Sequence, residues 1–157
     1  MSFEKAKEYL DNKGFGERVK HFDVSSATVE LAAKAVGTEA ARIAKSLTFK
    51  IDEKPIMIIA AGDVKIDNQK YKAHFSAKAK MLSPEEVDNF IGHSIGGVCP
   101  FGINDGVDVY LDESLKRFDI VYPACGDARS AVKLTPDELY SLANCKSWID
   151  VCKLVEA

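Results

Sequence analysis

Apolar and polar residues alternate along the chain with two different periods, which predict a mixture of helices and strands. Apolar residues recur at helical spacing over residues 2–14, where glycine ends the pattern. The same spacing returns over residues 29–36, between a capping hydroxyl at Thr28 and a terminating Gly37. A short strand is expected between these two helices, at 18–22.

The middle of the chain has the pattern of a β-hairpin. Apolar residues alternate with polar ones in SLTFKI at 46–51, and IMIIAA at 56–61 is almost wholly apolar. DEKP at 52–55 supplies turn residues between the two strands. Directly before the hairpin, Thr38 is expected to cap a short helix that extends to Ala44.

Further elements after the hairpin decide the fold class. Asp67 is placed to cap a helix, and capping boxes at Ser83 and Thr135 start two more. Apolar runs at 107–111 and 120–124 are typical of strands. Because helices and strands mingle throughout, the sequence predicts an α/β or α+β fold with a mixed sheet.

Composition agrees with one folded domain over residues 1–157, without linkers or internal repeats. Hydrophobic residues make up 46% of the chain and charged residues 29%, which excludes disordered and collagen-like classes. No apolar stretch has the length of a signal peptide core or a membrane span, so we expect a cytoplasmic protein with no membrane partner. The four cysteines lack zinc-type spacing, so we expect reduced thiols and no metal.

Charge is distributed unevenly along the chain. The formal net charge is −3, which excludes proteins that coat nucleic acid through charge alone. Residues 45–80, however, contain eight lysines and four acidic residues. Such a segment suits an anionic ligand whose phosphates position it, although a lysine-rich segment is more often only a solvated face.

The segment GHSIGGVCPFG at 92–102 has the most unusual composition in the chain. Four glycines and a proline in eleven residues make a poor helix and a poor interior strand. Successive amides in such a loop can approach a carbonyl oxygen or a developing oxyanion. A tight turn between two strands explains the same composition equally well.

Two side chains are candidates for chemistry on their own. Lys45 lies beside an apolar strand, where a partly buried ammonium needs a partner or a substrate oxygen, although a surface lysine with a packed stem is the commoner case. Cys99 with His93 or His74 as base would make a thiol nucleophile. Most free cysteines are instead small buried hydrophobes, and we favour that interpretation for Cys99.

Several segments together carry a resemblance to a known family. They are TVELAA at 28–33 to IAKSLTF at 43–49, AAGD at 60–63, GGVCPFG at 96–102 and GDARSAVKLTPDEL at 126–139. In this order they resemble the YbaK/prolyl-tRNA synthetase-associated domain family, whose members hydrolyse mischarged aminoacyl-tRNA. The resemblance covers nearly the whole chain. It implies a compact α/β fold with a mixed, partly barrel-like sheet, a small pocket, and no metal or organic cofactor.

The resemblance also implies which residues form the site. It assigns catalysis to Lys45 and to the backbone of Gly96 and Gly97. Substrate binding falls on Thr28, Ser46, Gly62, Asp63, His93, Val98, Cys99, Pro100, Phe101, Gly102 and Ser130. Contacts with tRNA are expected from Lys65, Lys70, Lys72, Lys78 and Lys80. The late turn CGDARS departs from family forms richer in Ser, Asn or Gly, so Asp127 and Arg129 are expected to alter the pocket mouth.

The expected substrate is an aminoacyl-tRNA, with Ala or Cys on tRNA(Pro) as the leading pairs, and prolyl-tRNA synthetase is an expected partner. An aminoacyl ester is already activated, so positioned water and oxyanion stabilisation suffice for its hydrolysis. Two other classes of function stay open: a regulatory module that binds the tRNA end or a protein partner without catalysis, and a hydrolase that depends on the Cys99 thiol.

Overall fold

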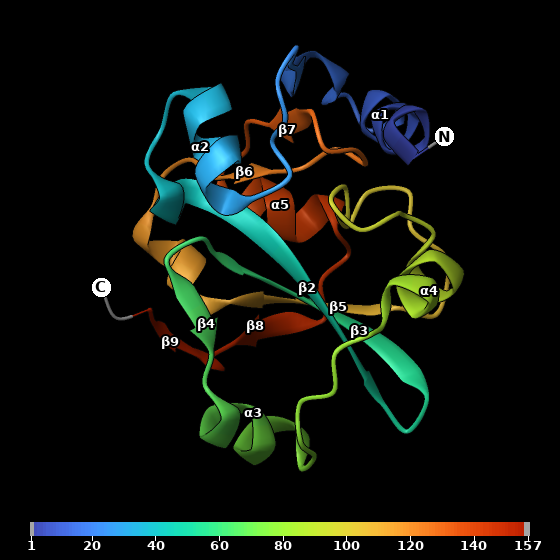
Figure 1. The fold of residues 1–157 in the computed structure, drawn as a ribbon, viewed down its shortest axis with the longest axis vertical. Coiled ribbons are helices and arrows are strands. Elements are labelled where there is room, and N and C mark those ends of the chain that lie inside the picture. The colour runs from blue at the N-terminus through green and yellow to red at the C-terminus, as the bar shows by residue number, and fades with distance from the viewer. Residues whose placement is uncertain (1, 156–157) are drawn as a thin grey trace.

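A curled, five-stranded mixed sheet forms the centre of the structure, a computed structural model in which residues 2–155 are described (Figure 1). The α/β fold with a mixed sheet is therefore confirmed. The strands lie in the order β6 (Tyr122–Pro123), β2 (Ile43–Ile51), β3 (Lys54–Ala61), β5 (Asp108–Asp112) and β8 (Ser147–Ile149). β2 and β3 are antiparallel, whereas the other three pairings are parallel.

The predicted hairpin is confirmed, but its first strand is longer than expected. β2 begins at Ile43, and only a 3₁₀ turn, η2 (Ala40–Arg42), precedes it. The short helix expected up to Ala44 is therefore wrong beyond this turn. Ile43 pairs with Tyr122 of β6 while Ala44 pairs with Ala61 of β3, so pairing on both sides overrides the weak local helix signal.

Two small sheets flank the central one. β1 (Val19–His21) pairs with β7 (Ser130–Val132), and β4 (Val64–Ile66) pairs with β9 (Cys152–Leu154), both antiparallel. Each pairing joins segments that are far apart in the sequence. Periodicity along the chain identifies such strands but does not reveal their partners.

Helices begin directly after four of the predicted capping residues, Thr28, Asp67, Ser83 and Thr135. The expected cap at Thr38 is wrong, because Glu39 precedes η2 and its side chain makes no capping bond. α1 (Ser2–Asn12) and α2 (Val29–Val36) lie towards the same end of the molecule, and α3 (Asn68–Phe75) lies at the other (Figure 1). Both expected capping boxes are present, at the starts of α4 (Pro84–Glu86) and α5 (Pro136–Leu142). The remaining turns are η1 (Gly16–Arg18), a π-turn η3 (Val87–Ile91) and η4 (Glu113–Arg117). None of the helices in residues 2–155 has the length and apolar character needed to cross a membrane.

β3 lies at the centre of the core, where its residues from Met57 to Ala61 are completely buried. Ala6 and Leu10 of α1 pack onto the same cluster, which explains the helical spacing of apolar residues there. Phe101, from the glycine-rich segment, is also completely buried. The apolar residues of that segment therefore anchor it in the core, and its backbone lies outside the core.

The glycine-rich loop packs backbone against backbone on the late turn at 126–130. A Cβ atom on Gly97 would lie 2.5 Å from Cα of Asp127 and 2.6 Å from its nitrogen. Gly126, with φ +88°, is in turn pressed against the carbonyl oxygen of Ser2. Only glycine fits at either position. The late turn therefore packs between the start of α1 and the glycine-rich loop, and the three segments form one stack.

We expect Gly97→Ala to lower the free energy of unfolding by about 2–3 kcal/mol, because the new methyl group forces two backbones apart. Gly106→Ala is the matched control, since Gly106 has φ +89° but open space around it. Gly106→Ala should lower the free energy of unfolding by only about 1 kcal/mol, which is the strain of a left-handed backbone alone. Urea denaturation of both variants checks the difference, and equal costs would contradict the close approach at Gly97.

Candidate active site

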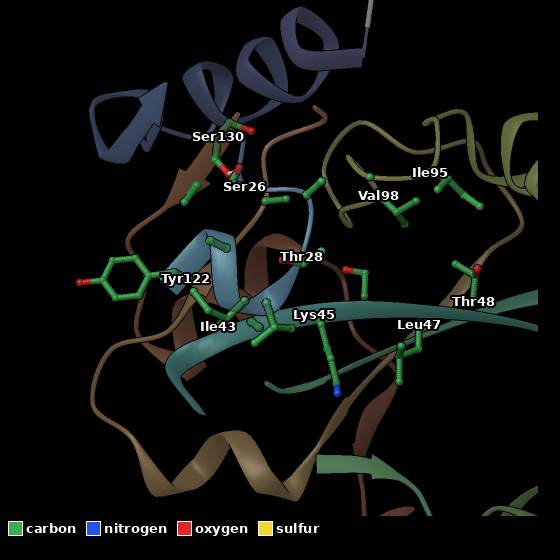
Figure 2. A pocket seen from close by; sticks show the side chains of 18 of the residues that line it. Ser26, Thr28, Ile43, Lys45, Leu47, Thr48, Ile95, Val98, Tyr122 and Ser130 are labelled. Atoms are coloured by element: carbon green, nitrogen blue, oxygen red, sulfur yellow. Dashed lines mark hydrogen bonds between the residues drawn. The ribbon is translucent and has the colours of Figure 1, made fainter. Parts of the chain in front are cut away.

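A cavity of about 250 Å³ opens between the start of α2, one face of β2, the loop at 95–98 and the segment 124–131 (Figure 2). Its lining is mostly apolar, with Val87, Val98 and Tyr122 among the larger side chains. The polar part of the lining consists mainly of hydroxyl groups. A mostly apolar hollow with a few convergent polar groups is the usual form of a small-molecule site.

Strand alternation divides β2 into a cavity face and an opposite face. Thr48 points towards Val98 and Ile95, and Ser46 shares its face two residues earlier (Figure 2). Within residues 2–155 neither hydroxyl has a hydrogen-bond partner in the protein. Both are therefore free to bind polar atoms of a ligand.

The other three serine and threonine hydroxyls of the cavity already bond to atoms of its wall. Thr28 caps α2, and its Oγ1 accepts from the amide of Leu31 at 3.1 Å. Ser130 Oγ accepts from the amide of Cys125 at 3.0 Å, while Ser26 Oγ lies 3.5 Å from the carbonyl oxygen of Ser130. These bonds join the start of α2 to the late turn on one side of the cavity.

The glycine-rich loop brings backbone donors to the cavity. Gly96 and Val98 both line it, and within the described part of the chain their amides donate to no protein acceptor. The amide of Gly97 is used internally, in a turn to the carbonyl of Ser94 at 3.1 Å. Gly96 has φ +95°, a conformation that favours glycine. Two free amides beside free hydroxyls can stabilise a carbonyl oxygen that gains negative charge.

Lys45 borders the cavity, but its ammonium leaves β2 on the opposite side (Figure 2). Its Nζ donates to the carbonyl oxygen of Val64, at the start of β4. Burial lowers the pKa of this ammonium, and the nearby Cys152 and Asp63 partly offset the effect. An ammonium has three donors, so two remain after the bond to Val64.

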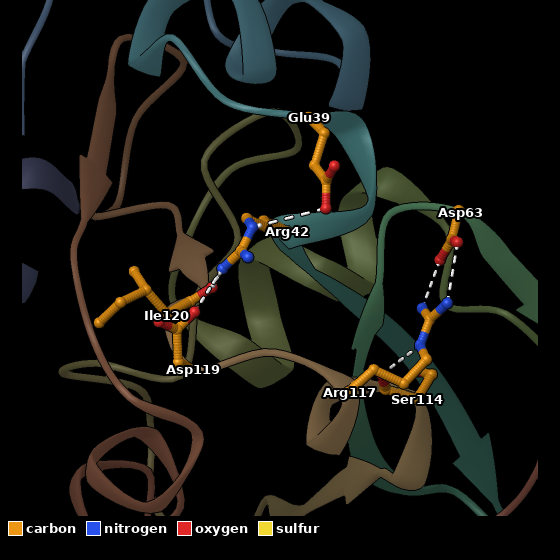
Figure 3. Close-up of polar contacts among 7 residues, drawn as sticks. All are labelled: Glu39, Arg42, Asp63, Ser114, Arg117, Asp119 and Ile120. Carbon is orange, nitrogen blue, oxygen red and sulfur yellow. Dashed lines mark hydrogen bonds and ion pairs between the residues drawn. The ribbon is translucent and has the colours of Figure 1, made fainter.

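Gly62 and Asp63 lie in the turn between β3 and β4, outside the cavity lining. Asp63 receives a bidentate ion pair from Arg117, with N–O distances of 2.6 and 3.0 Å (Figure 3). The hydrogen bonds from Arg117 hold the pKa of Asp63 below its ordinary value. Gly62 lets the turn pass against the carbonyl of Ala40, where a side chain would collide. Both residues therefore position the turn in this structure.

The same region holds a second cation shared between acidic groups. Arg42 binds Asp119 at 2.7 Å and lies 3.5 Å from Glu39 (Figure 3). It also donates to the carbonyl of Ile120, beside the start of β6. These bonds fix the segment that leads into Tyr122, which closes one end of the cavity.

His93 and Cys99 are buried behind the loop and do not line the cavity. His93 Nε2 lies 2.7 Å from the carbonyl oxygen of Phe101, so this nitrogen must carry the proton and donate it. Cys99 Sγ lies 3.5 Å from the same nitrogen, which therefore cannot serve as its base. Burial raises the pKa of the Cys99 thiol and lowers that of His93. The pair is neutral and packed, which argues against a thiolate nucleophile.

The other residues of this segment are also kept from the cavity. Pro100 and Phe101 are buried, and Gly102, with φ +67°, packs on the carbonyl of Lys5.

His74, the alternative base, lies on α3 with its ring 4.6 Å from that of Phe75. The structure thus brings Thr28, Ser46, Gly96, Val98 and Ser130 together from the expected site, together with part of Lys45.

Asp127 and Arg129 do not form the cavity mouth. Asp127 binds His21 at 2.9 Å, facing a second hollow on the far side of the loop, near Phe3. Burial would raise the pKa of Asp127, but hydrogen bonds from the Arg129 amide and from His21 hold it low. Arg129 is exposed. The late turn contributes Ser130 to the cavity instead.

The five lysines expected to contact tRNA are all exposed, and they lie on β4, on α3 and on the segment after α3. Lys70 is already bound to Asp150 at 3.0 Å and to the carbonyl of Cys152. In the described part of the chain Lys65, Lys72, Lys78 and Lys80 make no ion pair. Lys78 and Lys80 lie within the three residues before Met81, which lines the cavity.

The sequence-based reasoning missed several cavity residues, including Ser26, Thr48, Met81, Ile95 and Tyr122. Period-two alternation in SLTF could have identified Thr48 as a partner of Ser46. The others come from separate segments, and no local pattern marks them. Across residues 2–155, His, Cys, Asp and Glu side chains form no group of three that could hold a metal ion.

Comparison with known proteins places this geometry in a family. The sequence pattern of the aminoacyl-tRNA editing domain matches residues 23–142. YwhH of Bacillus subtilis (strain 168), an uncharacterized protein, is 56% identical over 136 residues, which cover 86% of this chain and 87% of YwhH. A proline–tRNA ligase of Lactiplantibacillus plantarum is 24% identical over 79% of this chain, which spans only 22% of that ligase.

A solved structure agrees with both sequence comparisons. A candidate trans-editing enzyme for prolyl tRNA synthetase superposes with a TM-score of 0.87 and 32% identity, over 97% of both chains. The match includes the curled mixed sheet and the helices around it. On its sequence and its fold together, the chain belongs to the aminoacyl-tRNA editing domain family.

Proposed function

We propose that this protein hydrolyses the ester bond of mischarged aminoacyl-tRNA, acting in trans to preserve translational fidelity. The cavity is the observation that carries the proposal, because it combines free hydroxyls with free loop amides in a mostly apolar hollow. Family membership supports the same class of substrate. The ligase relative and the structural match favour errors on tRNA(Pro), with prolyl-tRNA synthetase as partner.

In this mechanism the chain binds and orients the ester, and water is the nucleophile. The water oxygen attacks the carbonyl carbon, the bond to the ribose oxygen breaks, and that oxygen takes up a proton. The amides of Gly96 and Val98 stabilise the oxyanion, while Ser46 and Thr48 hold the aminoacyl group. A hydroxyl or amine of the substrate itself accepts the proton of the attacking water, since His93 is buried and neutral.

Lys45 acts from the other side of β2. Its partly buried ammonium keeps two donors beyond the bond to Val64, and a ribose or phosphate oxygen of the substrate would offset its desolvation. We therefore assign Lys45 to orientation of the nucleotide. Gly97 supports the loop amides through its contact with Asp127.

The cavity has room for a small aminoacyl group. Its volume of about 250 Å³ exceeds the roughly 150 Å³ of an engineered protein cavity that binds benzene. A side chain such as that of Ala or Cys therefore fits together with the ester. Since one methylene in an apolar pocket is worth only about 1–3 kcal/mol, we propose that collision with the cavity wall, more than binding energy, excludes larger side chains.

We expect the purified protein to release free amino acid from Ala-tRNA(Pro) or Cys-tRNA(Pro), and to leave Pro-tRNA(Pro) intact. The measurement is deacylation of a panel of aminoacyl-tRNAs, with and without EDTA. Hydrolysis should not require a divalent ion. Binding of the panel without release above the buffer rate would favour the regulatory module instead.

A second prediction separates the two catalytic hypotheses. Lys45→Ala should lower kcat/KM by about a hundredfold, because a misplaced substrate can lose about that much rate even where the changed residue is not at the reacting bond. Cys99→Ser should keep activity within about threefold, and iodoacetamide should not inactivate the folded protein. Thermal unfolding of both variants controls for the loss of the bond from Lys45 to Val64. Full activity in Lys45→Ala, or abolished activity in folded Cys99→Ser, would favour the thiol mechanism.

The unpaired lysines next to Met81 provide a third prediction. Lys78→Ala/Lys80→Ala should weaken tRNA binding evenly across tRNA sequences, because phosphate contacts carry little base information. The log–log dependence of affinity on salt should flatten by about 0.7–0.9 for each phosphate that the variant no longer neutralises. Lys54→Ala is the matched control, since Lys54 is bound to Asp108 at 2.9 Å. An unchanged slope in the double variant would show that these lysines form only a solvated face.

A further inference from the structure

The carboxylate of Asp127 binds two separate parts of the chain. Its Oδ1 accepts from the amide of Arg129 at 2.9 Å, within the late turn, and its Oδ2 lies 2.9 Å from Nε2 of His21 on β1. Burial raises the pKa of Asp127, but these hydrogen bonds hold it below its ordinary value. An ionised carboxylate can only accept, so His21 donates through Nε2. Both oxygens of one side chain are therefore used to hold the late turn.

His21 is itself held in position. Its backbone pairs with that of Ser130 where β1 and β7 run antiparallel. Its ring makes an edge contact with Phe3 of α1, with 4.7 Å between the ring centres. The residue before Phe3 is Ser2, whose carbonyl oxygen packs against Gly126 of the late turn. His21 therefore offers Asp127 a donor that is fixed by two other segments.

The backbone of Asp127 also supports the glycine-rich loop. A Cβ atom on Gly97 would lie 2.5 Å from Cα of Asp127, so the two backbones are in direct contact. Gly96 and Val98, which line the cavity, are the direct chain neighbours of Gly97. Because a contact this close leaves no free space, a shift of Asp127 must move Gly97 and the two residues beside it.

Backbone hydrogen bonds hold the part of the late turn that follows Asp127. The carbonyl oxygens of Ala128 and Arg129 accept from the amides of Ser26 and Phe22. Asp127 precedes these bonds, and it is linked to β1 through its side chain. Loss of that side chain would therefore loosen the turn at the point where the glycine-rich loop packs on it.

We propose that Asp127, together with its donor His21, is a positioning residue that fixes the loop amides of Gly96 and Val98. This inference rests on the proposed function, in which those amides stabilise the oxyanion of the substrate. Asp127 and His21 lie outside the cavity lining, so both act through the loop and not on the ester. Since a misplacement of about 1 Å can lower a rate by about a hundredfold, this pair affects the chemical step more than the binding of tRNA.

The kinetics of deacylation test the role of the carboxylate. Asp127→Ala should lower kcat by about tenfold or more and leave KM within about twofold, because the substrate still binds while the oxyanion donors are misplaced. Asp127→Asn should restore kcat to within about threefold of the wild type. Its side-chain oxygen can still accept from the amide of Arg129, and its NH₂ group can donate to the other tautomer of His21. His21→Ala should fall between the two, because the bond to Arg129 remains.

Arg18→Ala is the matched control for loss of a side-chain bond near β1. Arg18 directly precedes β1 and binds Glu138 of α5 at 2.8 and 3.1 Å, and its exposure is similar to that of His21. This variant should lower the midpoint of thermal unfolding at least as much as His21→Ala but keep the wild-type kcat. An equal loss of kcat in Arg18→Ala, or a wild-type kcat in Asp127→Ala, overturns the positioning role.

NMR of the free protein separates failure of this role from failure of the proposed function, because it needs no substrate. In Asp127→Ala the amide signals of Gly96 and Val98 should shift, and the amide of Gly97, which is bonded to Ser94, should exchange about tenfold faster. Arg18→Ala should leave all three amides unchanged. Unchanged loop amides in Asp127→Ala overturn the positioning role even if aminoacyl-tRNA is hydrolysed. Altered loop amides in that variant alone support it even where no ester is hydrolysed, and then only the proposed function fails.

Discussion

The cavity depends on the close backbone approach between the glycine-rich loop and the late turn. Gly97 lies against Asp127, and Gly126 lies against Ser2, with no room for a side chain at either position. Next to this stack Gly96 and Val98 line the cavity, while the apolar residues that follow them are buried. The glycines therefore serve the site mainly by permitting contact between backbones.

A second constraint is the alternation of side chains along β2. Neighbouring residues on a strand point to opposite faces, so Lys45 and Ser46 cannot both face the cavity. The structure assigns the cavity face to Ser46 and Thr48 and directs the ammonium of Lys45 to Val64. In the proposed mechanism the reacting bond and the positive charge are consequently separated by one strand, so Lys45 is better placed to hold the nucleotide than to contact the carbonyl.

Local patterns in the sequence predicted the features that depend on local energetics. The capping boxes of α4 and α5 and the β2–β3 hairpin are confirmed because their signals lie within a few residues. The start of β2 was predicted incorrectly because Ile43 pairs with Tyr122, about 80 residues later in the chain. The candidate site was also predicted only in part, because a sequence motif identifies a segment but does not show which of its atoms face a ligand. Gly96 and Val98 line the cavity while Cys99 to Phe101 fill the core, and only the folded backbone separates the two sets.

The chemistry of the proposed substrate explains why such a site would need no strong nucleophile. An aminoacyl ester is activated, and the barrier that remains comes mainly from placing water and from charge on the carbonyl oxygen. A buried, neutral Cys99 and a His93 that donates to Phe101 are consistent with this, since neither can generate a thiolate. The fold then has to hold amides and hydroxyls in fixed positions beside an apolar wall that excludes water. A stack of glycine contacts does this without a titrating nucleophile.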